Sequence, residues 1–168
     1  MNPSAKVCLL LVCISFASLV SPCSAAKTNF KKVGDARMEY LFWDVYDASL
    51  YTPSGQYESG SNPVKFTLTY LRDFAAKDIV KATKEQWQHL GKTDLAPKYA
   101  SQLLAMWPDI KKGESLSLKT SDSGVARFYH DGELLGEISD PDFAADFLAI
   151  WLSPQTSEPK LRKQLLGI

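Results

Sequence analysis

The chain has 168 residues, in which 19 lysines and arginines balance 19 aspartates and glutamates. Hydrophobic residues make up 45% and aromatic residues 11%, proportions typical of a folded globular domain rather than of a disordered or fibrous chain. The balanced charge, without a long run of Lys or Arg, argues against a nucleic-acid-binding surface. We therefore expect a globular protein of one domain with no nucleic-acid partner.

Residues 1–26 are expected to be a cleavable signal peptide. An apolar stretch, residues 7–20, follows a lysine and ends at Pro22, and small residues of the kind that signal peptidase accepts come next, at Ser24-Ala25-Ala26. The stretch is shorter than the roughly 20 apolar residues of a membrane-spanning helix, which is the alternative interpretation. The prediction is a secreted or periplasmic domain, residues 27–168, with no membrane span after cleavage.

All three cysteines lie in this expected leader, at Cys8, Cys13 and Cys23. Cys23 raises the alternative of a lipid anchor, but the proline before it is a poor match to the small residue that acylation requires. The mature domain would then have no disulfide, no cysteine-bound zinc and no thiol nucleophile. We expect neither a metal nor a cofactor, and the domain must be held together by core packing.

The segment from Arg37 to Tyr51 is rich in aromatic and β-branched residues. Both of its alternating sets of side chains are largely apolar, which is typical of a strand buried on both faces. The segment is long for one strand, so we expect a sharp bend or hairpin near Trp43 and Asp44. After a polar loop, residues 64–71 alternate apolar with polar side chains, which predicts a strand with one exposed face.

Two helices are predicted after this strand. Asp73 is expected to cap the first, which carries an apolar stripe through Leu90 and ends at Gly91. Asp94 is expected to cap the second, which ends at Pro108.

The remaining chain predicts three strands and then two helices. The strands are residues 115–120, 125–129 and 134–138, and Asp131-Gly132 suits a tight hairpin between the last two. The helices are expected to begin at Asp140-Pro141-Asp142 and at Ser157. Runs of like elements, rather than alternating strands and helices, predict an α+β fold with an antiparallel sheet.

Catalytic motifs are absent from the sequence, including the nucleophile elbow, the P-loop, the dinucleotide-binding motif and the zinc-protease motif. His89 and His130 are far apart in the chain and neither has an obvious partner, so no general base is predicted. Asp44 and Asp47 are three residues apart in an extended segment. They would leave the strand on opposite faces unless a bend or bulge separates them.

Three arginines fall in or at the end of predicted strands: Arg37, Arg72 and Arg127. An arginine in a largely apolar sheet suggests a fixed, bidentate contact with a carboxylate. That carboxylate is either internal, from a nearby Asp or Glu, or the head group of a bound apolar acid whose tail lies among aromatic side chains. Under the second interpretation the candidate ligand-binding residues are Arg37, Tyr46, Tyr70, Arg72 and Arg127.

Three segments together resemble the bacterial secreted proteins of the chalcone isomerase-like family: FWDVYDASLYTPSGQY, LRD, and ARFYHDGELLGEISDPDFAADFLAIWLSPQTSEPKLRKQLLG. The resemblance extends from about Val33 to Gly167. It implies the chalcone isomerase fold, a large antiparallel sheet with helices packed on one face and a cleft between them. This agrees with the order of elements predicted from the residues.

The plant enzymes of this fold close a chalcone to a flavanone, using a strand Arg, a Thr, a helix Tyr and a helix Asn. The resemblance implies that Arg37 takes the place of the strand Arg. The Thr position falls near Tyr46, and the Tyr and Asn positions fall near Ala76 and Thr83, so that set is mostly missing. Other proteins of the fold bind fatty acids without catalysis and retain the Arg as a carboxylate anchor.

The predicted function is therefore that of an exported, non-catalytic domain that binds a small apolar carboxylate, such as a fatty acid, between sheet and helices. One alternative is an isomerase or lyase that stabilises an oxyanion with Arg37, Tyr46 and Tyr70. Another is a structural or interaction protein without a ligand. An apolar cavity that reaches the guanidinium of Arg37 would favour the first hypothesis, whereas an Arg37 fully occupied by a neighbouring Asp would count against it. The sequence does not indicate an oligomeric state.

Overall fold

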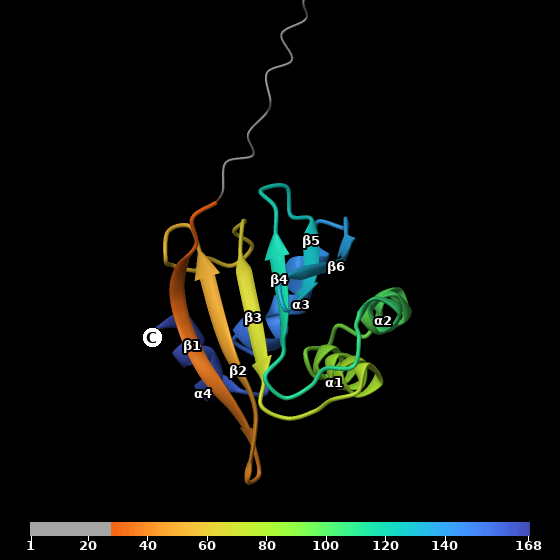
Figure 1. Cartoon of the computed structure of the whole chain (residues 1–168). Coiled ribbons are helices and arrows are strands. Elements are labelled where there is room, and N and C mark those ends of the chain that lie inside the picture. The colour runs from red at the N-terminus through yellow and green to blue at the C-terminus, as the bar shows by residue number, and fades with distance from the viewer. Residues whose placement is uncertain (1–27) are drawn as a thin grey trace, which may run out of the picture.

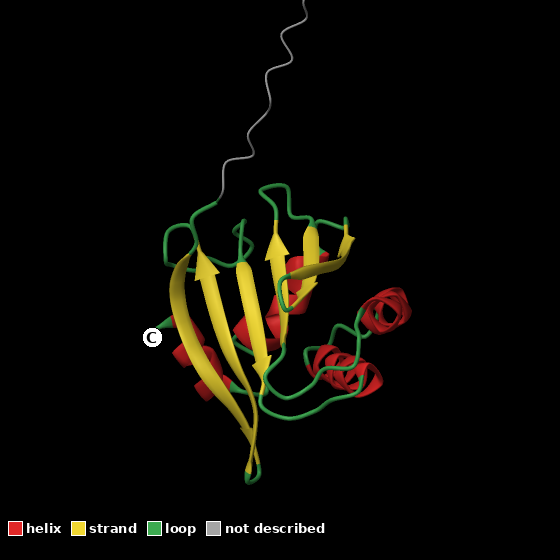
Figure 2. Ribbon diagram, viewed as in Figure 1, coloured by secondary structure: helices red, strands yellow, loops and turns green. Residues whose placement is uncertain are grey.

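A computed structural model of the protein describes residues 28–168, which form one antiparallel sheet and four helices (Figures 1 and 2). The predicted signal peptide lies outside the described residues. The strands pair in chain order, so each one contacts only its neighbours in the sequence. The strands are β1 (Lys31–Tyr40), β2 (Trp43–Thr52), β3 (Lys65–Tyr70), β4 (Ser115–Thr120), β5 (Ala126–His130) and β6 (Glu133–Ile138).

The helices are inserted at two points of this meander. The first pair connects β3 to β4, and the second pair follows β6, where α3 and α4 lie behind the sheet in Figure 1. Within the described part of the chain, no helix is both long and apolar enough to span a bilayer. The helices are α1 (Ala76–His89), α2 (Leu95–Met106), α3 (Phe143–Leu152) and α4 (Pro159–Leu166). The predicted α+β class is confirmed.

One face of the sheet is buried beneath the helices and the other is open. In β3, Phe66, Leu68 and Tyr70 are buried, whereas the alternate residues Lys65, Thr67 and Thr69 are partly exposed. The same alternation continues across β4, where Leu116 and Leu118 are buried. Because a strand points successive side chains to opposite faces, this pattern fixes which face carries the core.

The long aromatic segment at residues 37–51 is a hairpin, but the turn is not where the sequence indicated. β1 starts at Lys31, and the turn lies at Leu41 and Phe42, ahead of the predicted bend. Burial on both faces is also wrong for this segment, because Tyr40 to Trp43 are exposed and Asp47 lies on the open face beside Arg37.

The ends of the other elements follow local backbone chemistry. Asp131 and Gly132 both have positive φ, 47° and 90°, as predicted for a tight turn between β5 and β6. The predicted cap of the first helix is wrong: Asp73 accepts a hydrogen bond from the Lys112 amide, and Asp109 accepts one from the first amide of α1 at Ala76. The start of α1 is thus held by a residue from the loop before β4.

Aromatic side chains form the centre of the core between β5, α1 and α3. Phe143 and Phe147 of α3 stack at a centroid distance of 5.7 Å, and both contact Trp87 of α1 and Phe128 of β5. Trp107, after α2, packs edge-on against Phe128 at 5.3 Å. These contacts bring α1 and α3 together at one end of the buried face.

Gly34 in β1 lies against α4 without room for a side chain. A Cβ there would come within 2.3 Å of the Gln164 carbonyl oxygen and 2.6 Å of the Leu165 carbonyl oxygen. Gly34→Ala should therefore lower the free energy of unfolding by about 1–3 kcal/mol, measured by urea denaturation. Gly136→Ala is the matched control, because its Cβ meets only the flexible Met106 side chain, and it should cost less than about 1 kcal/mol. Equal losses in the two variants would contradict this account of the β1–α4 contact.

Candidate functional site

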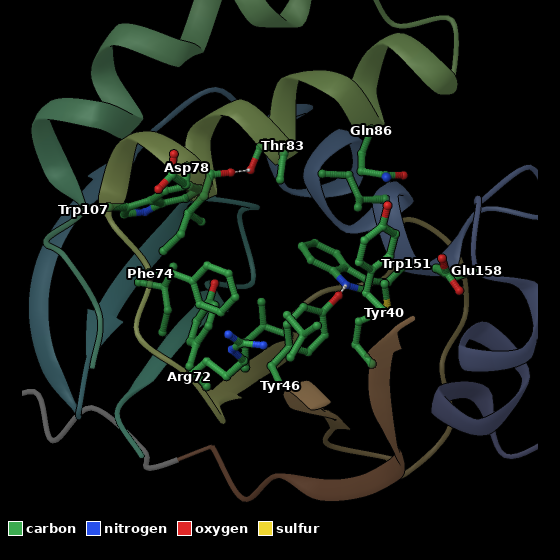
Figure 3. A pocket seen from close by; sticks show the side chains of 18 of the residues that line it. Tyr40, Tyr46, Arg72, Phe74, Asp78, Thr83, Gln86, Trp107, Trp151 and Glu158 are labelled. Carbon is green, nitrogen blue, oxygen red and sulfur yellow. Dashed lines mark hydrogen bonds between the residues drawn. The ribbon is translucent and has the colours of Figure 1, made fainter. Parts of the chain in front are cut away.

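A cavity of about 450 Å³ lies between the buried face of the sheet and helices α1 and α3 (Figure 3). Its volume falls in the range of sites that hold small organic molecules. Strand residues from β1 to β4 form one wall, and side chains of α1 and α3 form the other. Apolar and aromatic groups dominate the lining, which includes Met38, Tyr40, Trp43, Val45, Tyr46, Leu68, Tyr70, Phe74, Ile79, Trp107, Phe147, Ile150 and Trp151.

Two tyrosines predicted as ligand-binding residues lie side by side in this wall. Tyr46 and Tyr70 pack edge to face with their ring centroids 5.9 Å apart. The Tyr46 hydroxyl accepts a hydrogen bond of 2.9 Å from the indole N–H of Trp151 on α3, a contact drawn in Figure 3. Within residues 28–168, the Tyr70 hydroxyl has no side-chain hydrogen-bond partner. It is thus a free polar group among apolar neighbours.

Burial raises the pKa of both hydroxyls above the ordinary value of a tyrosine. Removal from water raises the pKa of Tyr46 to about 12, and the hydrogen bond from Trp151 only partly offsets this effect. Burial likewise raises the pKa of Tyr70, with a smaller contribution from the neighbouring Tyr46. At neutral pH, therefore, the Tyr70 hydroxyl can donate a hydrogen bond to a ligand oxygen.

Arg72, two residues beyond the end of β3 and exposed to solvent, is the arginine that lies at the cavity. Its guanidinium carbon stands 4.2 Å from the ring centroid of Trp43, and Figure 3 shows it between Tyr46 and Phe74. No carboxylate pairs with Arg72 in the described residues. The adjacent Asp73 instead bonds to the Lys112 amide at 2.9 Å. Arg72 thus offers a cation held by aromatic stacking, with its hydrogen-bond donors free.

Arg37 and Arg127 lie outside the cavity, on the open face of the sheet. The Arg37 Nε and Nη2 donate to the two carboxylate oxygens of Asp47 at 2.7 and 3.0 Å, and Nη1 donates to Asp44 at 2.9 Å. Arg127 Nε donates to Glu137 at 3.0 Å. The internal-carboxylate interpretation therefore describes these two arginines. The expected contact of Arg37 with a bound acid does not fit its position.

A bulge in β2 explains how Asp44 and Asp47 both reach Arg37. The register shifts between Met38 and Glu39, so that Asp47 pairs with Arg37 while Asp44 pairs with Glu39. The extra residue, Val45, lines the cavity together with Tyr46. This is the irregularity that the spacing of the two aspartates required.

The structure adds cavity residues that the sequence analysis missed. Trp43, Phe74 and Ile79 line it, and so does Asp78 at the start of α1. Trp107 also lines it, and the indole N–H of Trp107 is buried without a hydrogen-bond partner in residues 28–168. Of the two positions that the resemblance pointed to on α1, Thr83 lines the cavity and Ala76 does not. The apolar stripe of α1 could have indicated Ile79, because it faces the sheet.

The histidines lie elsewhere. His89 Nε2 is 3.0 Å from the Gln155 carbonyl oxygen, and His130 Nε2 is 3.0 Å from a carboxylate oxygen of Glu114. Glu114, His130 and Asp131 are close enough to be considered as metal ligands. However, both carboxylates are already held by backbone amides, of Lys111 and Ser115. These hydrogen bonds hold the turn before β4 and the turn after β5 in place, so the three side chains have a structural role.

The comparisons with known proteins agree with this geometry. The chalcone isomerase-like family matches residues 24–167, so the chain belongs to that family. An uncharacterized protein of Haemophilus influenzae is 24% identical over 155 residues, covering 90% of this chain and 76% of that protein. The solved structure of the Arabidopsis thaliana fatty-acid binding protein AtFAP1 matches with a TM-score of 0.64 at 12% identity, covering 87% of this chain and 90% of that one. The family resemblance and its fold are therefore confirmed.

Tyr46→Phe should lower the free energy of unfolding at neutral pH by about 1–3 kcal/mol, because the Trp151 N–H loses its acceptor. The variant should also lose less stability as the pH rises from 10 to about 12. In this window the unfolded tyrosine ionises, whereas the folded one stays neutral, so ionisation favours unfolding of the unmodified protein. Urea denaturation over a pH series measures both effects.

Tyr40→Phe serves as the control for this experiment, since Tyr40 is 63% exposed. It should leave the neutral-pH stability unchanged. If Tyr46→Phe and the unmodified protein lost stability in parallel above pH 10, the buried state of the Tyr46 hydroxyl would be contradicted.

Proposed function

We propose that this protein binds an apolar molecule with an acidic head group, of the fatty-acid class, in the cavity between the sheet and helices α1 and α3. The observation that carries the proposal is the combination of a largely apolar cavity with one unpaired arginine, Arg72, at its edge. An apolar tail would occupy the aromatic wall, and the acid would meet the guanidinium.

Three donor groups in the lining support an acidic ligand. Arg72 has donors without a protein acceptor in the described residues, and the Tyr70 hydroxyl is a second free donor in the same lining. The buried N–H of Trp107 is a third donor without a partner in this part of the chain. The Trp107 N–H is fully buried, so it is costly unless a ligand or a water accepts from it, whereas the exposed Arg72 guanidinium reaches water when no ligand is bound. A carboxylate, which only accepts hydrogen bonds, suits such a set.

The isomerase or lyase alternative has less support. Among the cavity residues, the groups that could take a proton are Asp73, Asp78 and Glu158; the first two are exposed at the rim and Glu158 is partly exposed. Neither histidine belongs to the lining. AtFAP1, which shares the fold, is by its name a fatty-acid binding protein, and this favours binding over catalysis.

Dodecanoic acid is a suitable probe. Its binding is measured by calorimetric titration of the purified protein, from which any co-purified lipid has first been removed by organic extraction. Arg72→Ala should weaken binding by about tenfold to a hundredfold, because one charge-assisted contact is lost. Arg37→Ala is the matched control: it removes a strand arginine on the opposite face and should leave the affinity unchanged. A loss with Arg37→Ala but not with Arg72→Ala would overturn the assignment of the head-group site.

Ile79→Trp tests the position of the tail. Ile79 is a half-buried lining residue of α1, and the larger ring would fill part of the cavity. We expect dodecanoic acid binding to be abolished while circular dichroism and the unfolding midpoint stay close to those of the unmodified protein. Unchanged binding by this variant, or no binding by the unmodified protein, would contradict the proposal.

We also propose that the domain acts outside the cytoplasm, after removal of residues 1–26. The support is the apolar stretch at residues 7–20 followed by small residues before Lys27. Intact mass spectrometry of the protein, expressed from its full sequence in a bacterium and recovered from the periplasmic fraction, would measure this. The expected mass is that of a chain that begins at Lys27, and a full-length chain in the cytoplasmic fraction would refute the proposal.

A further inference from the structure

The turn between β1 and β2 exposes four large hydrophobic side chains in succession, which we call the hairpin tip, Tyr40–Trp43. Their exposed fractions are 63%, 77%, 96% and 58% in chain order. Figure 1 shows this hairpin extending beyond the ends of the other strands. A contiguous apolar patch of this kind on a protein surface marks a site that contacts a membrane or a partner.

The backbone of the hairpin tip gives a second, independent observation. Leu41 has φ 55°, in the left-handed region that is unfavourable for a residue with a side chain. Glycine or asparagine would adopt this conformation more easily. An apolar side chain therefore occupies an exposed position at which local energetics favour a small or polar residue, which indicates that the side chain itself has a use.

The order of side chains in the hairpin tip matches the profile of a lipid surface. Leu41 and Phe42, at the turn, are purely apolar. They are flanked by Tyr40 and Trp43, the residue types that concentrate at the boundary between hydrocarbon and water. Immediately behind come the exposed carboxylates of Glu39 and Asp44, which would remain in water. This order from apolar to amphipathic to charged is the one met on passing from the hydrocarbon core of a bilayer outward into water.

The hairpin tip is continuous with the cavity. Tyr40 and Trp43 belong to the tip and also line the cavity, and Arg72 stacks on Trp43. We propose that the hairpin tip inserts into the surface of a lipid bilayer and holds the cavity entrance against it, so that an apolar acid passes between bilayer and cavity. The transfer part of this proposal rests on the function proposed above, whereas the insertion part does not.

The charges near the hairpin tip indicate how it would bind. Two cations, Arg37 and the Arg72 stacked on Trp43, stand against the three carboxylates of Glu39, Asp44 and Asp47, so the region has no positive surplus. Attraction to anionic lipids therefore contributes little, and insertion depends on apolar burial. Binding should occur on vesicles of phosphatidylcholine alone and should change little with salt.

Flotation of the purified protein with phosphatidylcholine vesicles tests the insertion. Phe42→Asp should lower the fraction bound at least about tenfold, because the most exposed apolar side chain of the tip is replaced by a charge. Leu134→Asp is the matched control: Leu134 is 58% exposed on β6, away from the hairpin tip, and its loss should leave flotation unchanged. All proteins must have the same N-terminus by mass spectrometry.

The location of the contact is tested by quenching with phosphatidylcholine brominated along its acyl chains. Quenching of tryptophan fluorescence should fall in Trp43→Phe, because the other tryptophans, Trp87, Trp107 and Trp151, are buried. Equal flotation of Phe42→Asp and the unmodified protein would overturn the proposal. So would a dimer, seen by light scattering without vesicles, that Phe42→Asp converts to a monomer with flotation unaffected, because the hairpin tip would then join two copies.

Transfer is measured separately, as the rate at which dodecanoic acid leaves vesicles for the protein. Phe42 does not line the cavity, so Phe42→Asp should slow this transfer about tenfold while the affinity in vesicle-free solution stays the same. An unchanged rate would overturn the role of the hairpin tip in transfer. Absence of binding in vesicle-free solution would instead refute the proposed function and leave the flotation result to stand by itself.

Discussion

The bulge at Val45 determines the character of both faces of the sheet near the cavity. A regular β2 would alternate its side chains, and Asp44 and Asp47 would then lie on opposite faces. With one extra residue, both carboxylates reach Arg37 on the open face, and both Val45 and Tyr46 line the cavity. The apolar lining and the ion pairs of Arg37 with Asp44 and Asp47 are therefore two results of a single irregularity in strand pairing.

Arg37 and Arg72 have different contacts, and this leaves them with different capacities to bind a ligand. Arg37 is held by two internal carboxylates, whereas Arg72 is held by an aromatic ring that leaves its donors free. A cation that is already paired gains little from an incoming acid. Membership of the chalcone isomerase-like family gives the fold, and the proposed position of the acid head group rests on this difference between the two arginines.

Much of the fold was predictable because its elements obey local rules. The helix from Ala76 to His89 has a clear apolar stripe, the helix from Phe143 to Leu152 is apolar almost all round, and the Asp131-Gly132 turn has its usual sequence. The start of β1 was missed because residues 31–36 lack an apolar alternation. The first hairpin was misplaced because Leu41-Phe42 carries no turn signal. Arg72 could not be ranked above Arg37, since periodicity does not tell which face of a strand the helices will cover.

The left-handed backbone at Leu41 has a consequence for engineering. A laboratory selection for thermal tolerance would favour Gly or Asn at this position, since either relieves the unfavourable φ without disturbing the core. Such a variant would be more heat-resistant but would lack the apolar Leu41 side chain at the turn of the hairpin. A screen that scores only folding would thus enrich variants with higher thermal stability that lack the exposed leucine side chain of the hairpin.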